Sequence, residues 1–272
     1  MPPGPSRHQT GLPADLSRSK GVRRLRFQVA YDGTEFNGWQ VQPGLPTVQG
    51  ILEEVISGME GRHVDVIGSG RTDAGVHAFG QVAAVSIANP IPVDNFRRAV
   101  NRLLPKAIRI SSVQEAAADF HPRFDAKRKL YRYRIYREEV CPPFERHFVT
   151  HHPYPLNEVA MTETAPLLEG EHDFTAFAAT DPSDSSGRSR VRRVFSSVLK
   201  REGAMLIYEV SGSGFLKHMV RNIVGVLLEV GKGNLNRGDV LARLESPAGI
   251  RPGPSAPPSG LFLVSVDYDA TV

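Results

Sequence analysis

The chain has 272 residues, of which 40% are hydrophobic and 23% charged, with a formal net charge of +4 and a single cysteine, Cys141. This length is enough for about two domains, each able to bury a core without disulfides or bound metals. One cysteine excludes an intrachain disulfide framework, argues against a thiolate metal site and fits a reducing cytoplasm.

The first 22 residues are rich in Pro, Ser and Arg and lack the apolar stretch of a signal peptide. We interpret them as a disordered tail. No part of the chain reaches the roughly 20 consecutive apolar residues that a membrane span requires. We therefore expect a soluble, cytoplasmic protein.

The N-terminal half alternates strands and helices. Apolar and polar residues alternate over 25–31, which predicts a strand with one buried face. A helix is predicted over 48–59, with Thr47 as its N-cap and Gly61 as a stop signal. The later elements are two short strands, a helix and a strand, at 64–67, 81–87, 94–104 and 108–113. The order β-α-β-β-α-β is typical of a ferredoxin-like unit.

The C-terminal half repeats this alternation without a residue-level repeat. The predicted elements are a strand, a helix weakened by Pro166, two strands, a helix and a strand, at 129–137, 156–169, 191–199, 205–210, 215–230 and 261–268. We predict an α+β protein with two similar ferredoxin-like domains, residues 23–117 and 118–272, whose antiparallel sheets flank a central basic cleft. The Pro-, Gly- and Ser-rich segments 180–189 and 246–259 are interpreted as surface additions without a catalytic role.

Positive charge is concentrated in two runs. Residues 123–137 contain seven Lys or Arg side chains and one acid, Asp125, and residues 188–201 contain six and no acid. A solvated surface can have this composition, but two such runs in a basic chain favour a polyanionic partner. Nucleic acid is the leading candidate.

Residues 68–78 place one carboxylate, Asp73, in a loop with three glycines between two predicted strands. Glycines allow a ligand to approach the backbone closely, and Arg71 and His77 add charge and hydrogen-bonding groups. The composition of this run alone is equally compatible with a polar turn.

Two residues of the C-terminal half complete the candidate constellation. Arg221 borders the apolar stripe of its predicted helix, where a guanidinium either needs a carboxylate partner or extends to water. Tyr131 shares a strand face with Tyr133 and is either a core residue or a platform on which a base stacks. The sequence has neither a metal-ligand cluster nor a phosphate-binding glycine loop, so no metal and no cofactor is predicted.

Over residues 24–268 the chain resembles the TruA-type tRNA pseudouridine synthases. The motifs that carry the resemblance are Tyr31-Asp32-Gly33-Thr34, Gly38-Trp39-Gln40, Thr47-Val48-Gln49, residues 70–78, Tyr131-Arg132-Tyr133, His172-Asp173-Phe174 and His218-Met219-Val220-Arg221-Asn222. The segment between Phe177 and Arg193 departs from the family pattern.

The resemblance implies roles for single residues. Asp73 would be the catalytic aspartate, Arg221 its basic partner and Tyr131 the aromatic residue that stacks on the target uracil, while Arg71 and His77 would help to place the RNA. It further implies a homodimer that converts uridines thirty-eight to forty of the tRNA anticodon stem-loop to pseudouridine, without a cofactor.

The chemistry of a carboxylate leaves the mechanism open. It could attack C6 of the base, attack C1′ of the ribose, or remove a proton from the sugar. Two other functions remain as alternatives: an RNA-binding module without activity, and a metal-dependent nuclease.

Overall fold

The N-terminal half folds largely as its sequence predicts. The computed structural model describes residues 21–179, 189–247 and 249–269, so most of the predicted tail and most of segment 180–189 lie outside the described residues. Strand β1 (Arg23–Tyr31) buries alternate apolar side chains. Helix α1 (Val48–Glu60) starts at Thr47, whose hydroxyl accepts a hydrogen bond from the Gly50 N–H, and ends at Gly61 with a φ of 66°. The next elements are β2 (Ile67–Gly68), β3 (His77–Ile87), α2 (Val93–Leu103) and β4 (Ile108–Ala116).

The C-terminal half contains six strands and three α-helices within the described residues. The strands are β5 (Arg128–Tyr136), β6 (Thr150–His151), β7 (Gly170–Asp173), β8 (Val191–Glu202), β9 (Met205–Gly212) and β10 (Leu261–Asp267). The helices are α3 (Glu158–Thr164), α4 (Met219–Gly231) and α5 (Arg237–Glu245).

Several predicted boundaries are wrong, each for a local reason. The helix predicted over 156–169 is a short α3 that changes to a 3₁₀ turn (Ala165–Leu168) containing Pro166, which cannot donate to the helical ladder. The strand predicted over 64–67 shrinks to β2. Helix α5 was not predicted, although Asn236 and Asp239 form a capping box at its start that is readable in the sequence.

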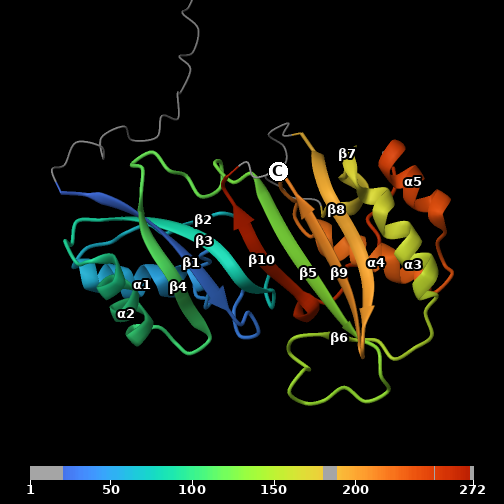
Figure 1. Cartoon of the computed structure of the whole chain (residues 1–272), viewed down its shortest axis with the longest axis horizontal. Coiled ribbons are helices and arrows are strands. Elements are labelled where there is room, and N and C mark those ends of the chain that lie inside the picture. The colour runs from blue at the N-terminus through green and yellow to red at the C-terminus, as the bar shows by residue number, and fades with distance from the viewer. Residues whose placement is uncertain (1–20, 180–188, 248, 270–272) are drawn as a thin grey trace, which may run out of the picture.

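The strands form one mixed sheet in the described part of the chain. Its order is β4-β1-β3-β10-β5-β9-β8-β7, with β2 also paired to β3 and β6 to β5. Strand β10 lies parallel to β3 and antiparallel to β5, so its two edges satisfy backbone groups of both halves. The expectation of two separate antiparallel sheets is therefore wrong, because the last strand returns between the halves and joins them (Figure 1).

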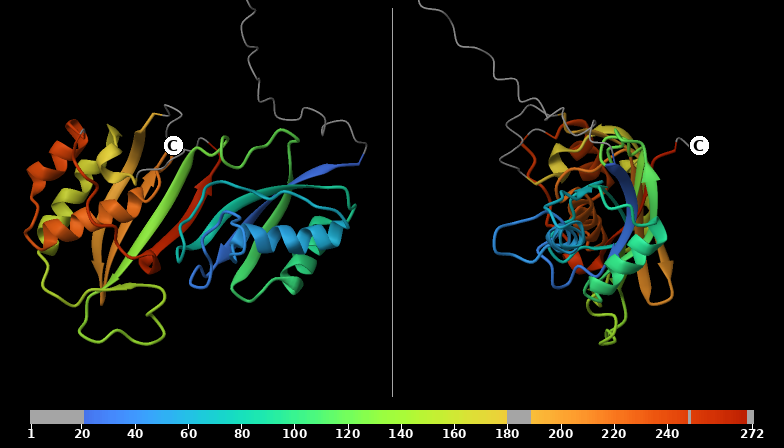
Figure 2. Two further views of the ribbon diagram at one scale, coloured as in Figure 1. Left: turned by 180° about the vertical axis from the view of Figure 1, so that it is seen from behind. Right: turned by 90° about the vertical axis from the view of Figure 1, so that its left-hand side faces the viewer.

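The α-helices cover one face of this sheet (Figures 1 and 2). Helices α1 and α2 lie on the N-terminal half, and α3, α4 and α5 lie on the C-terminal half. The largest fully buried side chains include Trp39, Tyr133 and Tyr208. No helix in the described ranges has both the length and the apolar character needed to cross a membrane.

Candidate functional site

A cleft of about 1060 Å³ is lined by residues of α1, β5, β10 and α4. The loop that carries Asp73, the start of α4 and the side chain of Tyr131 form its walls and floor. Seven Lys or Arg residues line it: Arg71, Arg123, Lys129, Arg190, Arg192, Lys217 and Arg221. The lining acids are Asp65 and Asp73. The cleft therefore brings together residues of both halves of the chain.

The Asp73 loop is fixed by the segment that follows β1. The Trp39 N–H donates to the Thr72 carbonyl oxygen at 3.1 Å, and the Thr72 hydroxyl shares a 2.8 Å hydrogen bond with the Tyr31 hydroxyl. Gly38 has a φ of 85°, and a Cβ at this position would lie 2.4 Å from the Thr72 carbonyl oxygen. Glycine is required here by both conformation and contact. The Gly38-Trp39 motif thus holds the backbone beside Asp73.

Arg221 reaches Asp73 across the cleft. Its Nη1 lies 3.0 Å from Oδ2 of Asp73, and only 14% of its side chain is exposed. Its Nε donates to the Ala256 carbonyl oxygen at 2.8 Å, and the Ala256 N–H donates back to the Arg221 carbonyl oxygen at 3.0 Å. The ion-pair interpretation of Arg221 is confirmed, and the alternative, a guanidinium extended into water, is wrong.

Segment 246–259 is more than a surface addition, which corrects the sequence interpretation. Ala256 is buried, and the Tyr133 hydroxyl donates to the Pro257 carbonyl oxygen at 2.7 Å. The segment packs against α4 at Gly225, where a Cβ would lie 1.6 Å from the Pro254 carbonyl oxygen. Prolines reduce the entropy lost when such a segment becomes ordered. The segment therefore packs against α4 and accepts the hydrogen bond that orients Arg221.

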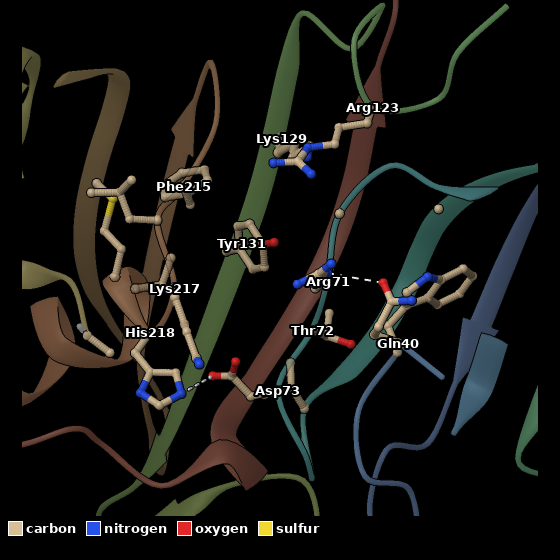
Figure 3. Close-up of a pocket in the computed structure, with 18 of the residues that line it drawn as sticks. Gln40, Arg71, Thr72, Asp73, Arg123, Lys129, Tyr131, Phe215, Lys217 and His218 are labelled. Atoms are coloured by element: carbon tan, nitrogen blue, oxygen red, sulfur yellow. Dashed lines mark hydrogen bonds and ion pairs between the residues drawn. The ribbon is translucent and has the colours of Figure 1, made fainter. Parts of the chain in front are cut away.

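His218 is a site residue that sequence reasoning did not assign. It precedes α4 with a φ of 60°, and its Nε2 lies 3.5 Å from Oδ2 of Asp73 (Figure 3). The helix predicted over 215–230 starts only at Met219 because His218 has a left-handed conformation. The only sequence signal was its place in the motif that also contains Arg221.

Tyr131 projects from β5 and lines the cleft, between Phe215 and Arg71 in the view of Figure 3. The ring is 8% exposed and meets Phe215 edge to face, with 5.0 Å between ring centroids. Burial raises the pKa of the Tyr131 phenol above its usual value, with smaller contributions from Tyr31 and Asp73. The side chain therefore offers an uncharged aromatic surface.

Two further cations lie along the cleft. The Arg71 Nε donates to Oε1 of Gln40 at 3.1 Å, so this exposed side chain extends along the cleft (Figure 3). The Lys129 Nζ donates to the Ser69 carbonyl oxygen at 2.6 Å. Burial, with a smaller contribution from Arg123, lowers the pKa of Lys129 to about 8. From the sequence, Lys129 is assigned to a basic run and to the start of a predicted strand, with no role in the site.

The structure does not bring His77 to this site. The residue is 1% exposed, its ring Nδ1 accepts from the Gly33 N–H at 3.0 Å, and its Nε2 donates to the His147 carbonyl oxygen at 2.9 Å. It also stacks on Phe262 with 4.8 Å between centroids. The expectation that His77 helps to place RNA finds no support in this position, because the residue is enclosed in the core.

Nowhere in the described ranges do three or more His, Cys, Asp or Glu side chains gather in a way that could hold a metal ion. Among the residues that line the cleft with Asp73 are the seven cations and the aromatic rings of Trp39, Phe124, Tyr131 and Phe215, which suit an anionic, planar ligand.

Comparison with known proteins identifies the family. The sequence profile described as tRNA pseudouridine synthase matches residues 28–125 and 164–269. The chain is 62% identical to tRNA pseudouridine synthase A of Solibacter usitatus, over 91% of this chain and 100% of that protein. It is 44% identical to the protein of the same name from Geobacillus kaustophilus, over 91% and 95% of the two chains. The corresponding protein of Acetivibrio thermocellus is 42% identical, over 91% and 100%.

Among solved structures, the archaeal box H/ACA sRNP Nop10-Cbf5 complex matches 75% of this chain and 44% of that chain, with 14% identity and a TM-score of 0.32. This similarity is too low to bear on function. The sequence comparisons alone are sufficient: the chain belongs to the tRNA pseudouridine synthase family.

Proposed function

We propose that this protein isomerises uridine to pseudouridine in tRNA, with Asp73 as the reacting carboxylate. The observation that carries the proposal is the Asp73 carboxylate, held 3.0 Å from Arg221 in a cleft that both halves of the chain form. Family membership supports the reaction type. An inert RNA-binding module would gain little from a carboxylate placed where phosphates approach.

The reaction fits the side chains in the cleft. Isomerisation breaks the bond between uracil N1 and ribose C1′ and forms a bond between C5 and C1′, with no net redox change and no added group. A carboxylate can act as a nucleophile or as a base in this sequence, and an adjacent cation can hold it in place through a charge-assisted hydrogen bond. Arg221 supplies that cation. Its second tie, to Ala256, fixes the direction from which it approaches.

A uridine within an RNA stem must leave the base stack before Asp73 can reach it. Flipping a base costs a few kcal/mol, and stacking on an aromatic ring returns about 1–3 kcal/mol. Tyr131 lies on the cleft floor and is proposed to provide this surface. Arg71, which lines the same cleft, is proposed to contact the RNA beside the flipped base. The other lining cations would bind phosphates, so binding should weaken as salt increases.

The finer substrate and assembly assignments are proposals as well. We propose uridines thirty-eight to forty of the anticodon stem-loop as targets and a homodimer as the working form, on the motif resemblance described above. The cleft would then lie between two domains, residues 23–117 and 118–272, each with a ferredoxin-like arrangement. A tRNA substrate and the single cysteine both fit a cytoplasmic enzyme. Because it is enclosed, His77 is proposed to have a structural role instead of an RNA-binding one.

The test measures tritium released from tRNA labelled at uracil C5, in the presence of EDTA. We expect release without chain cleavage by the wild type, and a loss of about 10³-fold or more in Asp73→Asn. Asp65→Asn is the matched control, because Asp65 also lines the cleft but has 83% of its side chain exposed. Tight tRNA binding without tritium release would indicate a binding module. Chain cleavage in a parallel assay with Mg²⁺ in place of EDTA would indicate a metal-dependent nuclease. Full activity of Asp73→Asn would remove Asp73 from the mechanism.

A further inference from the structure

His218 has an unusual backbone conformation for its residue type. Among the described residues it is the one non-glycine residue with a positive φ, 60°. This left-handed region is unfavourable for residues with a Cβ, and it costs glycine nothing. Such outliers persist where the surrounding structure requires them, often at sites that bind or react.

The side chain of His218 does not serve the helix that it precedes. It occupies the N-cap position of α4 but makes no side-chain capping hydrogen bond. A Ser, Asp or Asn residue at this position would ordinarily accept a hydrogen bond from the first turn. The imidazole instead extends into the cleft, where Nε2 lies 3.5 Å from Oδ2 of Asp73 (Figure 3). Helix initiation therefore does not explain why a histidine is present.

His218 and Arg221 converge on one oxygen atom. Both approach Oδ2 of Asp73, at 3.5 and 3.0 Å, and they are three positions apart at the start of α4. Side chains three positions apart lie on the same side of a helix. Arg221 is anchored by Ala256, and His218 is directed by its own backbone conformation. Arg221 donates a hydrogen bond to this oxygen and the imidazole of His218 lies against it, so the carboxylate has less room to rotate than it would beside Arg221 alone.

We propose that His218 is a positioning residue for Asp73, holding the carboxylate together with Arg221 in the orientation in which it meets the uridine. This inference rests on the proposed function of Asp73. The left-handed backbone is the structural requirement for this contact, because it turns the imidazole away from α4 and towards Asp73. A small misplacement of a reacting group can reduce the rate by about 10²-fold.

Substitution by glycine separates this role from a structural one. His218→Gly accepts a φ of 60° without strain and removes only the imidazole. We expect its thermal midpoint to equal or exceed that of the wild type and its dissociation constant for tRNA to stay within about two-fold. The single-turnover rate of tritium release should fall by about 10- to 100-fold. His218→Gln, whose amide can still donate to Asp73, should recover part of that loss.

The control is His63→Gly, which removes an exposed histidine that pairs with Asp65 at 3.2 Å. It should leave the rate unchanged. A wild-type rate in His218→Gly would overturn the proposal. So would a fall in rate accompanied by a lower thermal midpoint and weaker binding, because that pattern reports a structural role. Asp73→Asn is assayed in parallel to distinguish failure of the His218 proposal from failure of the proposed function. If Asp73→Asn retains full activity, the proposed function itself fails, whatever His218→Gly shows.

Discussion

Two histidine–aspartate pairs with similar spacing lie in different parts of the molecule. In one, Nδ1 of His77 is 3.2 Å from Oδ1 of Asp32, and in the other, Nε2 of His218 is 3.5 Å from Oδ2 of Asp73. The His77 side chain is 2% exposed, whereas that of His218 is 31% exposed. The residue types are therefore the same, but only the second pair is open to a ligand.

Hydrogen bonding to the backbone explains why the pair of His77 and Asp32 is not open to a ligand. Both ring nitrogens of His77 are used, one by the Gly33 N–H and one by the His147 carbonyl oxygen. The ring is also packed against Phe148 and Phe262. Burial lowers the pKa of His77, more than its contact with Asp32 raises it. A neutral, fully bonded ring stabilises the core but has no group left for a substrate.

The second pair differs because a cation shares its carboxylate. Asp73 has 27% of its side chain exposed and contacts both Arg221 and His218, on a cleft lined by further cations. If Asp73 reacts as proposed, burial and backbone hydrogen bonding distinguish the structural pair from the reactive one better than residue type or distance does.

The largest effect is expected when each carboxylate is neutralised in turn. Asp73→Asn should reduce the single-turnover rate by about 10³-fold or more, which corresponds to about 4 kcal/mol. Asp32→Asn should change it by less than about five-fold, because Asp32 lies outside the cleft lining. Rapid-quench assays of both variants on one tRNA provide the measurement. Equal losses would contradict the distinction between the pairs.

A smaller loss is expected at the cation that the reactive pair has and the structural pair lacks. Arg221→Gln removes the charge beside Asp73 and should lower kcat by about 10²-fold, with little change in KM. Arg221→Lys keeps a charge but loses the guanidinium that bonds to both Asp73 and Ala256. Its kcat should therefore lie between those of the wild type and Arg221→Gln. A rise in KM alone would instead assign Arg221 to RNA binding.

At the structural pair, stability should change and the activity of the folded enzyme should not. His77→Leu leaves the Gly33 N–H and the His147 carbonyl oxygen unpaired, at a cost of about 1–3 kcal/mol for each. Urea unfolding, with tritium release measured on the folded protein, tests this. A variant with normal stability and a lost activity would reverse the roles of the two pairs.

The pH dependence of stability at His77 follows from its lowered pKa. Because the folded protein resists protonation of this ring, the unfolded chain binds more protons just below pH 6.5. The free energy of unfolding should therefore decrease as the pH falls below 6.5, and this slope should be smaller in His77→Leu. Urea titrations at pH 5 to 7 measure it.

The smallest effect is expected at Lys129, on the edge of the reactive site. With a pKa of about 8, it loses its charge as the pH rises from 7 to 9. Affinity for tRNA should therefore weaken over this range by a few-fold, the contribution of about one phosphate contact. Lys129→Met should bind less tightly at pH 7 and show less pH dependence, measured by filter binding at constant salt. If tRNA affinity depends on pH equally in Lys129→Met and the wild type, Lys129 lies outside the RNA contact surface.

The sequence by itself determined the local structure and the identity of the main chemical groups. Alternation defined β1, Thr47 and Gly61 bounded α1, and the glycine-rich run identified the loop of Asp73. These features depend on neighbours within a few residues, so a linear pattern contains them. The cap of α5 at Asn236 was equally local and could have been read in the same way.

Only the tertiary structure decided which of these groups meet. Asp73 and Arg221 are 148 residues apart, and their contact depends on β10 inserting between β3 and β5. The support from Ala256, the enclosure of His77 and the approach of His218 likewise depend on packing between distant segments. A sequence pattern specifies which face of an element is apolar, but not which surface will cover it. Burial, which separates His77 from His218, is therefore a property of the whole fold.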